Sequence, residues 1–403
     1  MLKEKLYDIL DSKSEEIIAI RRYLHKYPEP SFQEFKTAEY IKNFYQGKDI
    51  EWLRYPVGLN GVAVKIKGGA CKEKENQKRK TLAIRGDFDA LAIKEETDVS
   101  YKSVNPEAMH ACGHDAHTAI LLETADALIE LKEELPGDVL IIHQYAEEVP
   151  PGGAKFMIEN GVLDKVDAII GGHVWASYET GEIAVRSGMA MAGRAYFKVI
   201  ITGKGGHGSQ PHCCVDPIVA ASHFVVAAQS IIGRNLNPVD SAVITIGRFE
   251  GLGKFNVIPN SVTLEGDVRS CSESVTQLIK KRFKEILAGI SAAYGCSFEL
   301  VYDHDYPPVI NDGKLAEFAI DFINAKSIPE LKLCQGEITM GSEDFSFYQQ
   351  KIPGLYVFFG AKPNGDSHEF YPHHHPKFNI DENCLISCAK FYAGFAVDFL
   401  ENF

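Results

Sequence analysis

The chain lacks three features that would point to particular classes of protein. Its 42 Lys and Arg are outnumbered by 55 Asp and Glu, so the net charge of −13 argues against binding to nucleic acid or to an anionic membrane and favours small solutes as partners. No apolar run approaches the roughly 18 residues that span a bilayer. Charged residues interrupt the apolar positions of residues 1–20, so an amphipathic helix is expected there rather than a signal peptide. The nine cysteines are odd in number and scattered, which predicts reduced thiols and a cytoplasmic location.

Potential metal ligands concentrate in one short stretch. Thiol, imidazole and carboxylate donors share eight residues, His110-Ala111-Cys112-Gly113-His114-Asp115-Ala116-His117. In an extended segment Cys112 and His114 fall on the same face, so both can reach one ion. Apolar residues recur at helical spacing from Ala119 onwards, which places the donors in a loop before a helix that Asp115 can cap. The stretch predicts a metal site, and the alternative is a buried cysteine beside a helix-capping aspartate.

Three predicted strands in this half of the chain end in further candidate ligands. These are Asp87 and Asp89 after residues 81–85, Glu147 and Glu148 after residues 139–145, and His173 after residues 166–172. Ligands of open α/β sheets bind beyond the carboxyl ends of the strands, so these side chains are expected to gather at one edge. For the two aspartates the alternative is a pair of turn residues.

The organisation changes after residue 195. The pattern predicts a strand at 196–201, a helix at 217–232, strands at 242–246 and 261–268, a helix at 274–294 and a strand at 297–302. This βαββαβ order is typical of an α+β ferredoxin-like unit. We place an inserted domain at residues 187–303, so that residues 1–186 and 304–403 form one discontinuous α/β domain. The helices expected at residues 2–27 and 34–45 are interpreted as scaffold.

A glycine-rich loop follows the first strand of the inserted domain. Residues 203–208 satisfy G-x-G-x-x-G, but Pro211 and the pair Cys213 and Cys214 intervene before the helix, and no ribose-binding acid stands about 20 residues further on. Dinucleotide binding is therefore not expected. What remains is a flexible loop that presents His207, either as a functional residue or as an ordinary turn histidine.

Spacing alone yields a mixed donor set. It comprises Cys112, His114, one of Glu147 and Glu148, His173, and one of His373, His374 and His375. Sulfur, nitrogen and oxygen donors together suit zinc, manganese, cobalt or nickel better than magnesium or calcium. Five ligands exceed one tetrahedral site and suggest two ions that share ligands, with Asp87 and Asp89 as support and the second glutamate free to act as a base.

With these residues assembled, the chain resembles the zinc-dependent aminoacylase and carboxypeptidase superfamily, in particular its hippurate hydrolases, N-acyl-amino-acid amidohydrolases and auxin-conjugate hydrolases. The resemblance covers nearly the whole chain. It rests on residues 85–91, 110–117, 146–148, 172–173, 205–212, 256–259, 341–345 and 374–376. The chain departs from the family pattern at Gly86 and Ala116, where many relatives have Ala and Gly.

The resemblance implies an architecture, a site and a reaction. The fold would be a mixed-sheet catalytic domain with an inserted lid and dimerisation domain, and the protein a homodimer. Two divalent ions per subunit would be held by Cys112, His114, Glu148, His173 and His374. Glu147 would be the general base in hydrolysis of an N-acyl amino acid. His207 would polarise the scissile carbonyl, either in its own subunit's cleft or in the partner's. Asn256 and Arg269 would bind the substrate's polar groups.

Several other activities remain open at this stage. A dipeptidase, a carboxypeptidase or an N-acetyl-diaminopimelate deacetylase of the same superfamily would use the same residues. Cys112 could be a thiol nucleophile with His114 as its base, although two side chains on one extended face suit a shared ion better than proton transfer. A catalytically silent metal-binding protein is the non-enzyme alternative, and the presence of Glu147 argues against it.

Overall fold

The computed structural model describes residues 1–53, 60–70, 79–363 and 371–403, and the chain divides into two compact units. The first unit contains Met1–Ala190, Ile310–Glu337 and Asp344–Phe403, and the second contains Met191–Val309 and Ile338–Glu343. Each unit is therefore built from segments that are distant in sequence.

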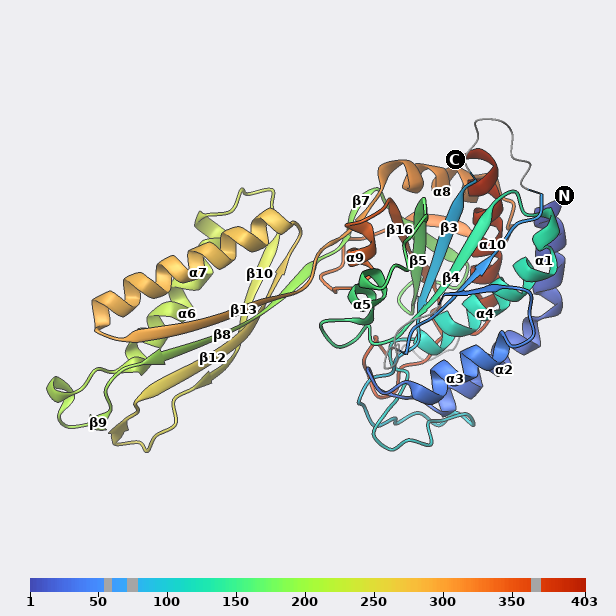
Figure 1. The fold of residues 1–403 in the computed structure, drawn as a ribbon. Helices are drawn as coiled ribbons and strands as arrows, with labels where there is room; N and C mark the ends of the chain where they lie inside the picture. The colour runs from blue at the N-terminus through green and yellow to red at the C-terminus, as the bar shows by residue number, and fades with distance from the viewer. Residues whose placement is uncertain (54–59, 71–78, 364–370) are drawn as a thin grey trace. The chain divides into compact units, whose positions relative to one another are not determined.

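A mixed sheet of eight strands forms the centre of the first unit (Figure 1). Its order is β1-β2-β4-β3-β5-β16-β6-β15. The strands are β1 Glu51–Leu53, β2 Val62–Ile66, β3 Thr81–Asp87, β4 Asp138–Gln144, β5 Ala168–Trp175, β6 Glu182–Val185, β15 Lys332–Gln335 and β16 Gly354–Gly360. Strands β3, β4 and β16 are buried at every residue, because helices cover both faces, and each accordingly contains an apolar stretch, at residues 82–84, 139–142 and 355–359. The expected mixed-sheet α/β domain is confirmed.

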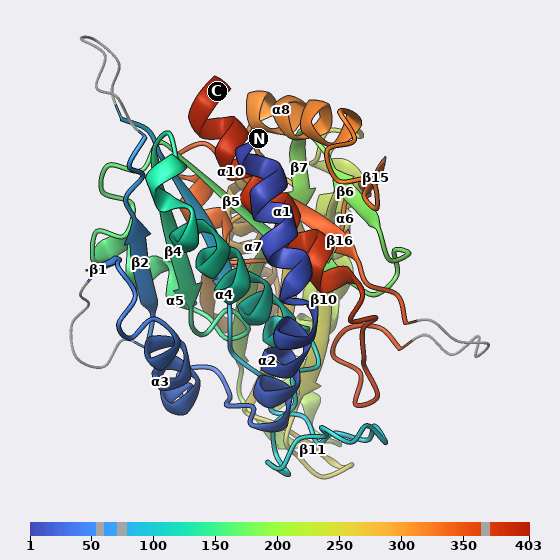
Figure 2. The ribbon, with the colours of Figure 1, turned by 90° about the vertical axis from the view of Figure 1, so that its right-hand side faces the viewer.

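The helices of the first unit cover this sheet. They are α1 Leu2–Ser12, α2 Ser14–Lys26, α3 Phe35–Phe44, α4 His114–Glu130, the short η1 Lys132–Glu134, α5 Gly153–Glu159, α8 Gly313–Asn324, α9 Ser346–Gln349 and α10 Cys384–Asn402. Helix α4 packs on β3 and is covered in turn by α1, α2 and α10, which explains why it is apolar on nearly every side (Figure 2). Figure 1 shows α5 and α9 on the side of β5 opposite to α4.

The register of the three central strands explains why distant residues meet. Strand β3 runs parallel to β4 and to β5, with Asp87 beside Gln144 and Arg85 beside Gly171. Two residues beyond Gly171 is His173, so the carboxyl ends of β3, β4 and β5 lie side by side. The segments that leave β3 and β4, and the end of β5, are thus held at one edge of the sheet.

The second unit is an antiparallel sheet with two helices. Its sheet order is β10-β12-β8-β13. The elements are β8 Gly193–Thr202, η2 Pro211–Cys213, α6 Pro217–Arg234, β10 Ala242–Glu250, β12 Ser261–Ser270, α7 Glu273–Tyr294, β13 Ser297–Tyr306 and the short pair β9 Gly206–His207 with β11 Val257–Ile258. A further short pair, β7 Gly188–Met191 with β14 Val309–Asn311, is made mainly of residues of the first unit. Asp216 caps α6 by accepting the N–H of Ile218, and Ser272 caps α7 by accepting that of Val275.

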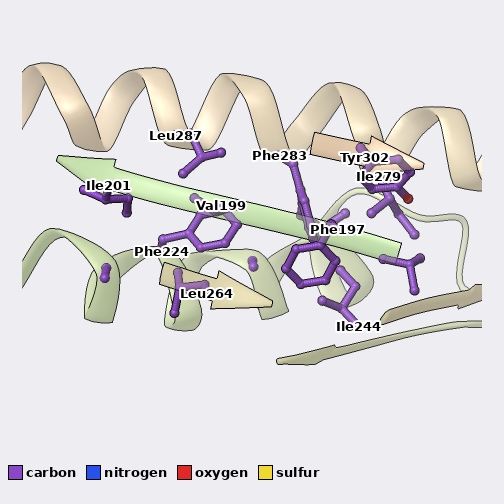
Figure 3. Packing of buried hydrophobic residues seen from close by; sticks show 14 of the residues in the cluster. Phe197, Val199, Ile201, Phe224, Ile244, Leu264, Ile279, Phe283, Leu287 and Tyr302 are labelled. Atoms are coloured by element: carbon purple, nitrogen blue, oxygen red, sulfur yellow. The ribbon is translucent and has the colours of Figure 1, made fainter. Parts of the chain in front are cut away.

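Strand β8 supplies the centre of this unit's core. Its residues alternate between buried and partly exposed, and Phe197, Val199 and Ile201 point at the helices (Figure 3). Phe197 packs edge-to-face on Phe283 of α7. Gly266 is required on the neighbouring strand, because a Cβ there would lie 2.4 Å from the Phe197 ring.

Candidate metal centre

His114 is the first residue of α4 and is oriented by Asp89. Its Nδ1 lies 3.0 Å from Oδ1 of Asp89, so Nδ1–H donates to the carboxylate and Nε2 is the ring nitrogen left for a metal ion. Nε2 is buried and has no hydrogen-bond partner within the described chain. The preceding Gly113 is needed in a left-handed conformation, with φ 94°, and a Cβ there would lie 2.5 Å from Val174. His114 therefore presents one unused ring nitrogen to the interior of the site.

His173 presents the same ring nitrogen from the end of β5. Its Nδ1 donates to the carbonyl of Val174 at 2.7 Å, and its Nε2 lies 3.3 Å from Sγ of Cys112. The two histidines thus share one arrangement, in which an oxygen accepts Nδ1–H and Nε2 is available as a ligand.

Glu148 and His374 complete the cluster. Oε1 of Glu148 is 3.3 Å from Nε2 of His374 and 3.9 Å from Nε2 of His114, and it has no hydrogen-bond partner among the described residues. The amide of Glu148 donates to Oδ2 of Asp89 at 3.0 Å. His374 has φ 67°, and its N–H donates to the carbonyl of Ala111 at 2.8 Å. This bond holds His374 beside the loop that contains Cys112.

The two neighbouring histidines point elsewhere. His373 lies 3.0 Å from the carbonyl of Val174 through Nε2 and stacks on Trp175, and His375 accepts the N–H of Lys377 at 3.0 Å. Of the three C-terminal histidines, His374 is the one whose ring joins the candidate ligands.

These donors form three overlapping groups, in each of which the ligand atoms lie within 4.8 Å of one another. The groups are Cys112, His114 and His173; Cys112, Glu148 and His374; and His114, Glu147 and Glu148. Shared members and unpartnered buried donor atoms are what two adjacent ions with common ligands require. The residues present therefore fit a pair of divalent ions.

The charges around His114 favour a cation. Burial opposes its protonation, yet Asp87, Asp89 and Glu148 together raise the pKa of His114 to about 10. Burial raises the pKa of the Cys112 thiol well above its usual range, and Glu148 adds to the effect. Carboxylates that stabilise positive charge on an imidazole also stabilise a metal cation in the same place.

A fourth group, Asp87, His114 and His117, is a hydrogen-bonded support and not a second site. His117 Nε2 accepts the N–H of Val174 at 2.9 Å, so its Nδ1–H donates to Asp87 at 2.6 Å. Both ring nitrogens of His117 are occupied. The structure thus gives the two aspartates different partners, since Asp89 holds His114 whereas Asp87 holds His117, whose other ring nitrogen accepts the N–H of Val174 beside His173.

Arg85 balances the charge of Asp87. Its Nη1 lies 2.6 Å from Oδ2 of Asp87, its Nη2 lies 2.8 Å from Asp344, and its Nε lies 2.9 Å from the amide oxygen of Gln144. Burial opposes ionisation, but His114, Arg85 and His117 hold the pKa of Asp87 well below its usual range. Residues 341–345, one of the segments that carry the family resemblance, thus contact this network through Asp344.

Comparison with known proteins identifies the family. The model of Peptidase family M20/M25/M40 matches residues 83–398. The chain belongs to this family. N-acetyl-L-cysteine deacetylase of Bacillus subtilis is 38% identical over 391 residues, which cover 97% of this chain and 90% of that protein. Thermostable carboxypeptidase 1 of Saccharolobus solfataricus is 37% identical over 401 residues, 99% of each chain. The crystal structure of B. subtilis YXEP, a dinuclear metal binding peptidase from the M20 family, is 34% identical with a TM-score of 0.83, and covers 98% of this chain and 100% of that one.

Membership of the M20/M25/M40 family confirms the resemblance that the sequence motifs indicate, and it makes the chain a hydrolytic enzyme. None of the helices in the described parts of this M20/M25/M40 peptidase is both long enough and apolar enough to cross a membrane.

The interpretation of Asp115 as a helix cap was wrong. Helix α4 begins at His114, two residues before the start that a cap at Asp115 implies, and Gly113 is its N-cap. Oδ2 of Asp115 lies instead 2.8 Å from Nε of Arg21 and 2.8 Å from Nδ1 of His25. Both partners come from α2, which the sequence suggested was only scaffold. The signal was present, because Arg21 and His25 fall on the buried face of α2 with Ile17.

Two further supporting residues of the M20/M25/M40 site come from the turn before α3. Ser31 Oγ donates to Oδ2 of Asp89 at 2.6 Å, and Glu34 accepts the N–H of Ala146 at 2.8 Å. Sequence analysis missed both, because a serine and a glutamate in a turn carry no distinguishing spacing.

The remaining candidates lie in the second unit. His207 is exposed, and its Nδ1 accepts the N–H of Ser209 at 3.1 Å, which leaves Nε2 toward solvent. Asn256 is adjacent, since its carbonyl accepts the N–H of Gly208 at 2.9 Å. Arg269 is not. It lies eight residues along β12 from Ser261, about 26 Å at the usual rise of a strand, and binds Asp267 at 2.6 Å.

Proposed function

We propose that this protein is a metal-dependent amidohydrolase that cleaves N-acyl amino acids to a carboxylic acid and a free amino acid. One observation carries the proposal. Donors from four separate parts of the chain, around residues 112–114, 147–148, 173 and 374, converge in overlapping groups that include a second glutamate, Glu147.

Cys112, His114, Glu148, His173 and His374 would hold two divalent ions, of zinc, manganese, cobalt or nickel. When bound, the ions would lower the pKa of a water molecule and stabilise the oxyanion that develops on the amide carbonyl. The chain's own contribution is orientation. Asp89 holds the ring of His114 through Nδ1, and the carbonyl of Val174 does the same for His173.

Glu147 is the proposed general base and acid. Glu147 is 6% exposed, and one of its carboxylate oxygens lies within 4.8 Å of ligand atoms of His114 and Glu148. The carboxylate is therefore beside the candidate metal ligands and shielded from bulk water. Its carboxylate oxygen takes a proton from the attacking water as the new C–O bond forms. It then gives that proton to the amide nitrogen as the C–N bond breaks, which releases the amine.

The thiol-nucleophile alternative is disfavoured by the same geometry. A nucleophilic cysteine needs a cationic neighbour that lowers its pKa. Burial instead raises the pKa of Cys112, and the carboxylates Glu148, Glu147 and Asp87 raise it further. A buried thiol surrounded by carboxylates is better suited to bind a metal cation than to act as a nucleophile.

We propose that the second unit is the ferredoxin-like lid and dimerisation domain. Its helices and its sheet order β10-β12-β8-β13 support that assignment. Within the described chain no strand pairs with the outer edge of β10, and Val243 and Phe249 on β10 are 45% and 44% exposed. Val226 on α6 and Leu252 and Phe255 after β10 are further exposed apolar side chains of this unit. An unpaired, partly apolar edge of this length favours pairing with a second copy.

The dimer would explain how the candidates of the second unit act. His207 and Asn256 lie at one end of β12 and Arg269 at the other, about 26 Å away. Both ends would contact one small substrate only if they come from different copies. We therefore propose that His207 and Asn256 act on the amide bound by the partner, where His207 donates to the developing oxyanion.

A second candidate is a carboxypeptidase, favoured by the likeness to the S. solfataricus enzyme over the whole chain. Hydrolysis of N-acetyl, N-benzoyl and long-chain N-acyl amino acids beside dipeptides, before and after chelation and metal re-addition, separates the two. Metal-restored release from acyl amino acids supports the amidohydrolase. Cleavage of dipeptides alone supports the peptidase, and no cleavage by metal-loaded protein would overturn both.

A further inference from the structure

One buried glutamate outside the metal centre binds two backbone N–H groups with a single oxygen. Glu34, the residue before α3, is 0% exposed. Its Oε1 accepts the N–H of Phe32 at 2.9 Å and the N–H of Ala146 at 2.8 Å, and its Oε2 accepts Nδ2–H of Asn60 at 3.2 Å. This carboxylate ties the turn before α3 to the segment that follows β4.

Both backbone donors belong to residues in an unusual conformation. Phe32 has φ 64° and Ala146 has φ 50°, in the left-handed region that residues other than glycine rarely adopt. The carbonyl of Ala146 also accepts the N–H of Gly153 at 2.9 Å, so both backbone polar groups of Ala146 are held. Such conformations persist only where the surroundings enforce them.

Ala146 directly precedes Glu147, so its backbone angles decide where Glu147 points. The amide on the other side, that of Glu148, is held by Asp89 at 3.0 Å. Glu147 is thus fixed between two anchored amides. The turn before α3 supports both anchors, because Ser31 donates to the same Oδ2 of Asp89 at 2.6 Å.

We propose that Glu34 is a positioning residue for Glu147. Glu34 fixes the left-handed backbone of Ala146 and so directs the Glu147 carboxylate. The inference rests on the proposed function, in which Glu147 transfers the proton. Without Glu34 the buried N–H of Ala146 would lack a partner and its backbone would relax. A displacement of about 1 Å at a reacting group can cost on the order of 100-fold in rate.

The test compares variants at position 34 with a matched control. Glu34→Ala removes the acceptor, and Glu34→Asp keeps the charge but shortens the reach. Glu34→Gln keeps an amide oxygen for Phe32 and Ala146, and Asn60 can turn its own amide to accept from the new NH₂. Glu123→Gln is the control, because Glu123 on α4 is equally buried and pairs with Lys13, away from Glu147.

We expect Glu34→Ala and Glu34→Asp to lower kcat about 10- to 100-fold with KM changed less than about twofold. Glu34→Gln should stay within about threefold of the wild type, the control should match the wild type, and the bound metal, counted by elemental analysis, should not change in any of them. If Glu34→Ala does not fold, the comparison of Glu34→Asp with Glu34→Gln decides.

Two kinds of failure are distinguishable. If the metal-loaded wild type cleaves no amide, the proposed function fails. If the wild type is active and Glu34→Asp retains the kcat of the control, or if the variants lose metal in proportion to activity, the positioning role alone is overturned.

Discussion

Asp89 connects His114 to Glu148, since one carboxylate oxygen lies 3.0 Å from Nδ1 of His114 and the other accepts the amide of Glu148 at 3.0 Å. A single buried side chain therefore orients two candidate ligands that are 34 positions apart in the chain. This aspartate contacts the ligands and would not itself contact the ions.

Replacing Asp89 should weaken metal binding without removing a ligand. In Asp89→Asn one oxygen becomes an NH₂ group, which donates and cannot accept, so only one of His114 and Glu148 keeps its acceptor. We expect metal affinity to fall about 10- to 100-fold, measured by competition with a chromophoric chelator. Asp126→Asn on α4 is the control, because Asp126 pairs with Lys13 and Lys48, and it should keep wild-type affinity. An Asp89→Asn protein that binds metal as tightly as the control would contradict this role.

Glu34 should also make stability depend on pH. Burial, with Asp89 nearby, raises the pKa of Glu34 from 4.5 to about 7. Folded Glu34 binds its proton more tightly than unfolded Glu34, so its contribution to stability is complete below pH 4.5 and is lost as the pH rises through 7. The loss is at most on the order of 3 kcal/mol.

Urea unfolding of the wild type and of Glu34→Gln across this range measures the effect. The free energy of unfolding of the wild type should fall relative to Glu34→Gln as the pH rises from 4.5 to 7. A Glu107→Gln variant, changed at an exposed glutamate, should run parallel to the wild type. Parallel curves for Glu34→Gln as well would mean that Glu34 does not titrate as proposed.

Mixing two inactive variants tests whether His207 acts across a dimer. A hybrid of one Glu147→Gln chain and one His207→Ala chain has a single competent site if His207 serves the partner. Random exchange makes about half of the dimers hybrids, so activity should recover to about a quarter of the wild-type value. No recovery, with hybrid formation verified by mass spectrometry, would place His207 in the same chain as the base it assists.

The sequence predicts some parts of this site better than others for a physical reason. Cys112 and His114 stand in one short motif, and the strands before Glu147 and His173 are recognisable as buried apolar runs, so the edge where they meet follows from parallel pairing. Glu34 and Arg21 reach the site only because α2 and the turn after it pack against α4 and β4. Neither residue has a local pattern that reveals such a tertiary contact.

The start of α4 at His114 also depends on tertiary contacts that the sequence does not reveal. An aspartate before an apolar helical run is a common cap, and the sequence cannot show that Arg21 and His25 compete for it. Their two contacts with Asp115 form in the buried interior and outweigh the local capping preference. The helix starts two residues earlier as a result.

The most direct test of the whole account is turnover by Glu147→Gln, with bound metal determined in the same samples. The variant keeps the size of the side chain and all five candidate ligands but removes the carboxylate that moves the proton. We predict that kcat on the best N-acyl amino acid falls about 10²- to 10⁴-fold while the metal content equals that of the wild type. A variant that retains wild-type turnover would contradict the central claim.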